Sequence, residues 1–193
     1  MITPLLHRSF RRAAILLACM LAAHAATAAV ATPPAGLPAS TDLDGLRARA
    51  ERGDARAHLE LGRRFAAGLG VPNDADRALR HFEQAAQRGS APAAFEMARH
   101  YSGLSGRTID LARAHRYLQQ AAAGGHRQAQ VDLGFLLFNG NAQVPKDLAG
   151  SLQWFRKAGR GGSMAAACML GDFHRRGLGG IAADQVQAVR WYR

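Results

Sequence analysis

The sequence is poor in cysteine and in long apolar runs. Only two of its 193 residues are cysteines, and removal of an N-terminal leader containing Cys19 would leave Cys168 without a disulfide partner. Its neighbours Met169 and Leu170 on a predicted helix favour a buried, unreactive thiol. The longest apolar stretch, Ala13 to Ala23, has about 11 residues, whereas a transmembrane helix needs roughly 20. We therefore expect neither an internal disulfide nor a spanning helix in the processed chain.

Motifs for catalysis or cofactor binding are also missing. The sequence has no G-x-S-x-G, no phosphate-binding glycine loop and no cysteine–histidine nucleophile signature. Its histidines are dispersed, with no H-x3-H pair that would place two metal ligands on one helix. We therefore predict no catalytic residues, no metal site and no cofactor.

The N-terminus is typical of a secretory signal. A basic start containing Arg8, Arg11 and Arg12 precedes the apolar stretch, and Ala26-Thr27-Ala28 fits an A-x-A cleavage site. We predict a signal peptide over residues 1–28 and a periplasmic or secreted protein. Residues 29–41, rich in proline and alanine, are predicted to be a mobile linker.

A second interpretation of the leader stays open. The stretch Leu16-Leu17-Ala18-Cys19 is similar to a bacterial lipobox. Processing there would leave Cys19 acylated and the protein anchored to a membrane as a lipoprotein. We expect membrane attachment only if Cys19 is lipidated.

Acidic residues are outnumbered. The chain has 14 Asp and Glu against 25 Lys and Arg, a formal net charge of +11. The leader contains three of the arginines and no acid, so the processed chain keeps 22 basic residues against 14 acidic ones, a net charge near +8. A basic surface attracts anionic partners, but export argues against nucleic acid. A dedicated anion site and an ordinary solvated helix surface are both compatible with this charge.

A unit of about 36 residues recurs four times after residue 53. Its glycines lie 36, 36 and 37 residues apart (Gly53, Gly89, Gly125 and Gly162). Three further positions keep this register: a small residue (Gly62, Ala98, Gly134 and Gly171), an aspartate (Asp74, Asp110, Asp147 and Asp184) and an aromatic or histidine (His81, Tyr117, Trp154 and Trp191). A fixed period of this length indicates stacked units that bury their apolar faces against their neighbours.

Each unit is predicted to be a pair of helices. In the first copy, apolar residues recur every four positions, as on one face of a helix (Ala57, Leu61 and Phe65). Gly62 keeps that helix slim, so that a partner helix can approach closely. Asp74 is the predicted N-cap of the second helix, and Gly89 is predicted to end it.

The spacing of the repeated residues also predicts where each repeat begins and ends. A half-repeat over residues 42–53 would cap the stack, and the repeats follow at 54–89, 90–125, 126–162 and 163–193. The last one is expected to be incomplete, because the sequence stops at Trp191-Tyr192-Arg193, within its second helix.

The pattern A-x3-L-G-x2-[FY]-x2-G-x1-2-G-V-x2-D-x3-A-x2-[WHY]-[FYL]-x2-A-A-x2-G resembles the Sel-like repeat, a relative of the tetratricopeptide repeat. The resemblance covers Ala57 to Arg193. It implies an all-α solenoid of stacked antiparallel helix hairpins, a right-handed superhelix of about four repeats, which works by binding proteins. Some exported members carry a cysteine pair in every repeat and have been linked to β-lactam binding or hydrolysis. This sequence lacks those pairs, so the resemblance does not transfer that activity.

Resemblance to tetratricopeptide repeats also implies that residues beside the small position of each first helix line a concave groove. The predicted partner-binding residues are Arg63, Phe95, Arg99, Phe135, Phe138 and Asp172. Arginines and phenylalanines together would suit an extended peptide that carries an acidic group and an apolar anchor. The alternative is that Phe95 and Phe135 only pack between repeats.

These observations predict a non-catalytic scaffold or adaptor of the bacterial cell envelope, with a protein or peptide as its partner. The alternative function is a cell-wall-related enzyme or a β-lactam-binding protein, which would be labelled covalently by a penicillin probe.

Overall fold

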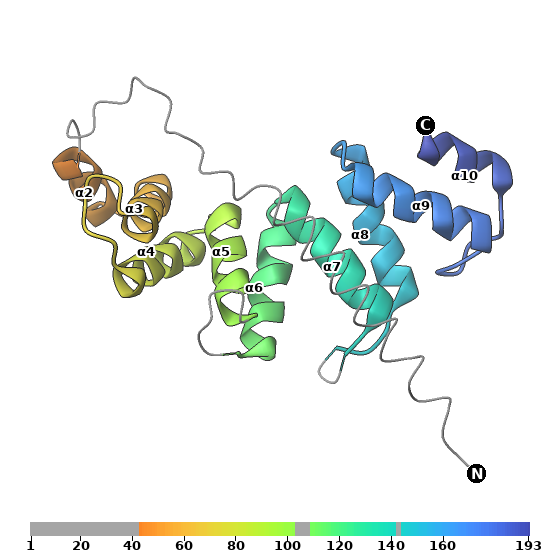
Figure 1. The fold of residues 1–193 in the computed structure, drawn as a ribbon, viewed down its shortest axis with the longest axis horizontal. Helices are drawn as coiled ribbons and strands as arrows, with labels where there is room; N and C mark the ends of the chain where they lie inside the picture. Colours follow the sequence, from red (N-terminus) through yellow and green to blue (C-terminus); the bar gives the residue numbers. More distant parts are fainter. Residues whose placement is uncertain (1–42, 103–108, 142–143) are drawn as a thin grey trace, which may run out of the picture. The chain divides into compact units, whose positions relative to one another are not determined.

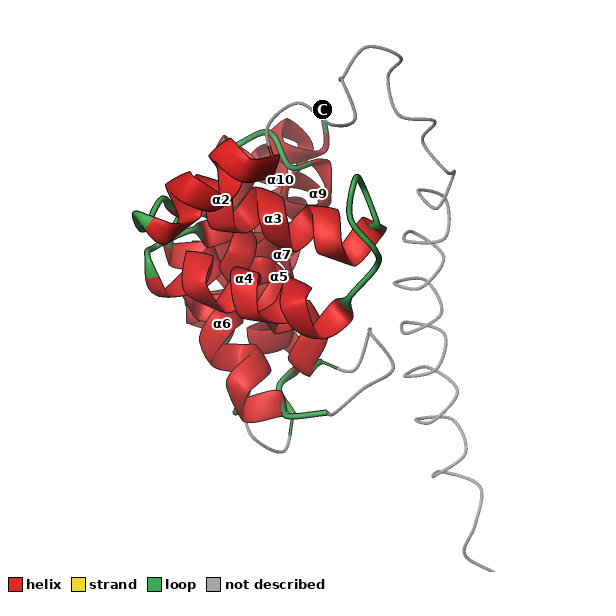
Figure 2. Cartoon of the chain, turned by 90° about the vertical axis from the view of Figure 1, so that its left-hand side faces the viewer, coloured by secondary structure: helices red, strands yellow, loops and turns green. Residues whose placement is uncertain are grey.

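The structure is a computed structural model that describes residues 43–102, 109–141 and 144–193. Within these residues it contains nine α-helices and no strand (Figure 2). The helices are α2 (Leu43–Glu51), α3 (Ala55–Ala67), α4 (Ala75–Gln87), α5 (Ala91–Tyr101), α6 (Leu111–Ala123), α7 (Arg127–Asn139), α8 (Leu148–Arg160), α9 (Met164–Arg176) and α10 (Gln185–Tyr192). The predicted signal peptide, linker and Cys19 lie outside the described residues.

Helices that follow one another in the chain pack side by side (Figure 1). The most extensive contacts join α3 to α4, α5 to α6, α7 to α8 and α9 to α10, so each repeat is a helix hairpin. The second helix of each hairpin then contacts the first helix of the next, and α2 packs on α3. The predicted all-α fold of about four hairpin repeats is confirmed.

The helix ends are set by the repeated polar residues. The four aspartates of the repeat are N-caps in extended backbone conformation, and each carboxylate accepts a hydrogen bond from the backbone N–H three residues later (Asp74, Asp110, Asp147 and Asp184). Such a cap stabilises a helix by about 1 kcal/mol. The repeated glycine follows each second helix with a positive φ of 80–87° (Gly53, Gly89, Gly125 and Gly162), a conformation that favours glycine.

The small position lies where the two helices of a hairpin meet. A β-carbon on Gly62 would be 2.6 Å from the Phe82 ring, and one on Gly134 would be 2.8 Å from the Phe155 ring. Real β-carbons do not approach other atoms so closely. The predicted role of this position, close approach of a partner helix, is confirmed.

Side-chain hydrogen bonds to backbone carbonyls join neighbouring repeats. A helix leaves its last four carbonyls without intrahelical partners, and three of these carbonyls near the ends of α2, α4 and α6 are paired with side chains (Ala50 with His58, Ala86 with Gln120, and Ala122 with Gln130). His58 and Gln130 occupy the same position of the repeat, directly after Ala57 and Ala129. The C-terminal carbonyls of one hairpin are therefore tied to the next hairpin.

Candidate functional site

The predicted partner-binding residues share one side of the first helices. Arg63, Arg99, Phe135 and Asp172 hold the same repeat position, and Phe95 and Phe138 lie one turn before or after it, on the same helix face. We call these six residues the first-helix face. Arg63 and Arg99 are exposed, and the other four are half-buried. Which of them contacts a partner remains a prediction.

Arg63 is the least engaged member of this face. It takes part in none of the ion pairs within the described residues, whereas Arg99 donates to the Glu96 carboxylate over 3.2 Å. Burial is the main cause that lowers the pKa of His126; the charge of Glu96 opposes this shift and that of Arg63 adds to it. The Arg63 guanidinium therefore contributes positive potential across α5 as far as the start of α7.

The three phenylalanines combine packing with partial exposure. Phe95 stacks on His126, with ring centroids 4.3 Å apart, and so joins repeat two to repeat three. Phe135 contacts the Phe155 ring edge to face at 5.0 Å. Phe138 contacts Phe173 at 5.7 Å, and the Lys146 ammonium lies 5.6 Å from its ring centroid. Each ring therefore has a structural partner and also keeps surface that another molecule could reach.

Asp172 has internal partners that the sequence did not reveal. Its carboxylate accepts hydrogen bonds from the Arg175 guanidinium and, at 3.0 Å, from the Tyr192 hydroxyl. These bonds, that of Arg175 above all, lower its pKa. Asp172 thus ties α9 to α10.

Two hollows adjoin the first-helix face. The first, the α3–α5 groove, has a volume of about 600 Å³ and is lined by Arg56, Leu59, Arg63, Arg88 and Pro92, among others. The second, the α5–α7 pocket, has a volume of about 220 Å³ and lies between α5, α6 and α7. Its lining includes two residues of the first-helix face, Phe95 and Arg99.

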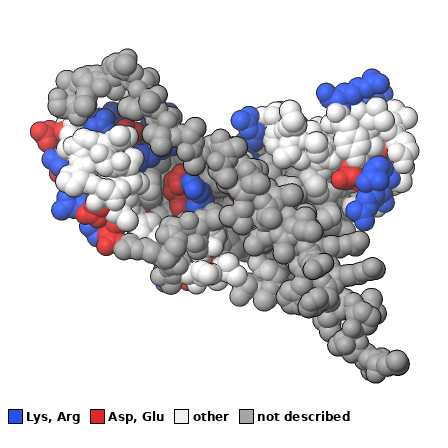
Figure 3. All heavy atoms as spheres, in the orientation of Figure 1, with Lys and Arg blue, Asp and Glu red and all other residues white. Residues whose placement is uncertain are grey.

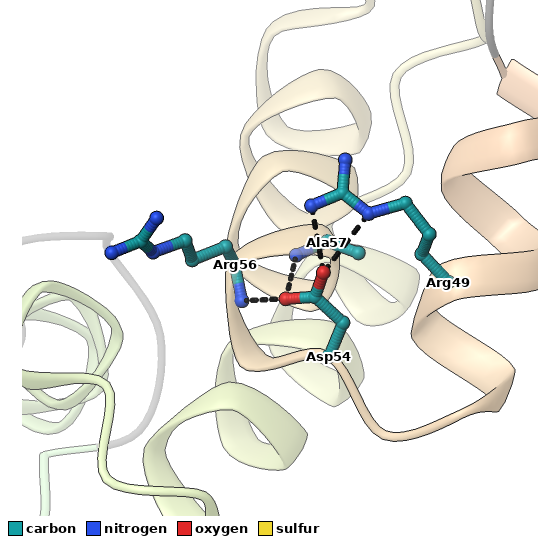
Figure 4. A network of polar contacts seen from close by, with 4 residues as sticks. All are labelled: Arg49, Asp54, Arg56 and Ala57. Carbon is teal, nitrogen blue, oxygen red and sulfur yellow. Dashed lines mark hydrogen bonds and ion pairs between the residues drawn. The ribbon is translucent and has the colours of Figure 1, made fainter.

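At the α2–α3 junction, one arginine side chain stabilises the fold and a second one points away into solvent. Arg49 of α2 donates two hydrogen bonds, of 2.9 and 2.7 Å, to one oxygen of Asp54 (Figure 4). The other oxygen accepts from the backbone N–H groups of Arg56 and Ala57. The hydrogen bond from Arg49 is the main reason why the pKa of Asp54 is lowered. The Arg56 guanidinium points away from this network and so is left for the α3–α5 groove (Figure 4).

The charged side chains in view do not form a single basic patch. Figure 3 shows basic and acidic residues side by side over α2–α4, and mostly basic ones over α8–α10. Seven ion pairs lie within the described residues, and most join residues three or four positions apart on one helix. Exposed pairs of this kind contribute only about 0–1 kcal/mol each. Arg56 and Arg63 belong to none of these seven pairs, and both line the α3–α5 groove.

A histidine pair that was not predicted from the sequence lies between α3 and α4. The Nδ1 atoms of His58 and His81 lie 3.1 Å apart, so one ring must donate a proton that the other accepts. His81, at the aromatic position of its repeat, also stacks on Phe65, with ring centroids 5.6 Å apart. Burial lowers the pKa of both histidines. The sequence did contain an indication of this contact, because His58 directly follows the repeated alanine, a position that faces the preceding helix.

The prediction that Cys168 is buried is wrong. Its thiol is free and exposed. The buried residues of α9 are Ala166, Leu170, Gly171 and Phe173, and at about 100° per residue the side opposite them carries Cys168. Its apolar neighbours in sequence suggested burial, but the phase of the helix decides it.

Two negative findings concern the described residues only. Residues 43–102, 109–141 and 144–193 contain no group of three His, Cys, Asp or Glu side chains that could hold a metal ion. No helix in the same ranges is long and apolar enough to cross a membrane.

Comparison with known proteins gives consistent matches. The Sel1 repeat family model matches residues 55–90, 91–126, 127–163 and 165–193. The crystal structure of a protective antigen present in uropathogenic Escherichia coli strains, which displays an SLR fold, is 35% identical with a TM-score of 0.70; the match covers 79% of this chain and 32% of that one. A Sel1 repeat protein from Oxalobacter formigenes is 33% identical with a TM-score of 0.69, over 76% of this chain and 42% of that one. The chain thus matches less than half the length of either protein. No curated protein matches it.

Proposed function

Because this chain belongs to the Sel1 repeat family, whose members generally act as protein-interaction scaffolds, we propose that it binds a segment of a partner protein on its first-helix face. The family's fold is typically non-catalytic. The partner we propose is a protein or peptide of the bacterial cell envelope, because residues 1–28 are typical of a secretory signal.

The main support for this proposal is that the Arg63 guanidinium is available to an acidic partner. Its side chain is exposed, has no carboxylate within ion-pair distance among the described residues, and lines the α3–α5 groove. A guanidinium offers two parallel donors to a carboxylate. Arg99 lies one repeat further along the same face, and its only ion pair within the described residues is the exposed one with Glu96. An acidic partner segment could therefore engage both arginines without breaking a buried contact.

The test is an affinity pull-down from an envelope extract with the full chain and its Arg63→Glu/Arg99→Glu variant. The matched control is Arg80→Glu/Arg116→Glu, which makes the same charge change at exposed positions of α4 and α6. We expect a partner that wild type and control retain and that the first variant loses. A partner held equally by all three proteins would place the site elsewhere.

Localisation requires its own test. We propose a periplasmic or secreted protein, with a lipoprotein anchored through Cys19 as the alternative. Membrane fractionation of wild type and Cys19→Ser separates the two. Attachment that is lost in the variant would establish the lipoprotein, and attachment that is retained would eliminate it.

The enzyme alternative also has a direct test. A cell-wall-related enzyme or β-lactam-binding protein would form a stable adduct with a labelled penicillin. We expect no labelling, and a saturable adduct would overturn the scaffold proposal.

A further inference from the structure

We propose that an extended acidic segment of the partner protein binds in a basic trough along the starts of the first helices. This inference rests on the function proposed above and adds a contact surface beside the first-helix face. The trough consists of two adjoining hollows, the α3–α5 groove and a second hollow of about 450 Å³ where α5 and α7 begin. The lining residues of the second hollow are Ala91, Pro92, Gly124, Gly125, His126, Arg127 and Gln128. We call the two hollows together the arginine trough.

The two hollows meet at the start of α5. Ala91, Pro92 and Gly124 line both of them. Gly124 holds the repeat position that Arg88 holds one repeat earlier, and a β-carbon on Gly124 would lie 2.7 Å from that of Ala91. No atom lies within 4 Å of a β-carbon built on either of the repeated glycines at the trough (Gly89 and Gly125). The backbone at these glycines is therefore open to another chain.

The charge of the trough is strongly one-sided. Its four arginines are exposed and belong to none of the ion pairs within the described residues (Arg56, Arg63, Arg88 and Arg127). Glu60 is the one acid among the lining residues, and it is paired with Arg64 over 3.1 Å. Asp54, at the start of α3, is likewise bound by Arg49. The described part of the chain therefore leaves the positive charge of the trough unbalanced.

Hydrogen bonds within the fold leave donors on these arginines. Arg88 uses Nη1 to donate to the backbone and side-chain oxygens of Gln84, over 2.9 and 2.6 Å. Arg127 uses Nη1 to donate to the Gly161 carbonyl over 2.6 Å. A guanidinium has five N–H donors on three nitrogens, so both side chains keep donors for a ligand. The Arg56 guanidinium points away from the Asp54 network (Figure 4).

The shape and charge of the trough suit an extended acidic peptide. A concave surface lined by charge of one sign concentrates its potential, and a carboxylate can accept two hydrogen bonds from one guanidinium. Arg56 and Arg63 are seven positions apart on α3, about 10 Å along the helix axis. An extended chain covers that distance in about three residues. Consecutive acidic side chains can therefore reach successive arginines, whereas a flat membrane surface would not enter the hollows.

The probe is a fluorescein-labelled decapeptide, Gly-Ser-Glu-Glu-Glu-Glu-Glu-Glu-Ser-Gly, and the comparison peptide has Gln in place of Glu. Fluorescence anisotropy with the full chain at low salt should show binding of the Glu peptide only, and the binding should weaken as salt is added. Arg56→Glu/Arg88→Glu should bind about tenfold more weakly, because two attractions become repulsions. Arg127→Gln, which removes one charge from the second hollow, should bind about threefold more weakly.

The matched control is Arg80→Glu/Arg116→Glu, which makes the same charge change at exposed positions outside the trough. It should bind the Glu peptide within about twofold of wild type. Thermal denaturation by circular dichroism checks that all variants fold as wild type does. Equal weakening in the control and in Arg56→Glu/Arg88→Glu would show that binding follows net charge alone and would overturn the proposal. Failure of the Glu peptide to bind wild type would overturn it as well.

Vesicles that contain phosphatidylglycerol distinguish a membrane from a protein segment. If they captured wild type but not Arg56→Glu/Arg88→Glu, while the Glu peptide stayed unbound, the trough would be a membrane-binding surface and the proposal would be wrong. In each of these failures, a partner still lost from Arg63→Glu/Arg99→Glu in the pull-down would leave the scaffold function standing. Failure of the trough and failure of the proposed function are therefore distinguishable.

Discussion

Replacing Gly134 with leucine tests the contact between the two helices of repeat three. Gly134 lies within α7, and a β-carbon built there would be 2.8, 2.9 and 3.0 Å from three atoms of the Phe155 ring. That ring cannot move aside easily, because it is 0% exposed and contacts Phe135 and Phe173 at centroid distances of 5.0 and 6.0 Å. The added atoms must therefore push α7 and α8 apart.

Two effects of opposite sign determine how much Gly134→Leu changes the free energy of unfolding. Removing a glycine from a helix interior gains about 1 kcal/mol in helix propensity, whereas overpacking a filled core costs about 1–3 kcal/mol and more when the added group is large. We expect the clash to prevail for leucine and to lower the free energy of unfolding by about 1–3 kcal/mol. Gly134→Ala should be milder, because only one carbon enters the interface.

The assay is urea and thermal denaturation followed by circular dichroism. For a chain of this size, each kcal/mol lost shifts Tm by about 2–4 °C. Ala149→Leu is the control, since it adds a similar side chain at an exposed position of α8 and should stay within about 0.5 kcal/mol of wild type. Combining Gly134→Ala with Phe155→Leu should show favourable coupling. If Gly134→Leu were as stable as wild type, the assigned helix contact would be wrong.

Two further predictions concern pH and capping. Burial lowers the pKa of His58, His81 and His126 below 6.5. Near and below pH 6.5 the unfolded chain therefore binds more protons than the folded chain. The stability that these neutral histidines contribute is fully present above about pH 6.5 and is lost as pH falls through their folded-state pKa values. Tm at pH 5.5 should therefore be lower than at pH 7.5, with a shallower dependence in His81→Phe, and a pH-independent Tm would contradict this. Asp74→Ala, which removes the α4 cap, should cost about 1 kcal/mol in chemical denaturation, and no loss there would show that the cap contributes nothing.

Much of the fold could be predicted from the repeated residues, because the role of each one depends on its local position in a helix. Asp74 could be assigned as an N-cap since a carboxylate at that point satisfies free N–H groups of the first turn. Gly62 could be assigned to a helix contact since glycine inside a helix is unfavourable without a packing reason. Both statements depend on residues close in sequence.

The site was less predictable because it depends on contacts between repeats. The stacking of Phe95 on His126 and the bond between Tyr192 and Asp172 join residues 31 and 20 positions apart. Their geometry is set by how the helices cross and which rotamers fit. Cys168 shows the same limit, since the choice between burial and exposure depends on the phase of α9.

Photo-crosslinking in cells shows whether the first-helix face contacts a partner. A photoreactive amino acid placed at Ser102, which is exposed one turn after Arg99, is compared with one at Arg80 on α4. We expect a discrete crosslinked partner from position 102 that is absent from position 80 and disappears when Arg63→Glu/Arg99→Glu is added. The same partner captured from position 80 but not from position 102 would contradict it.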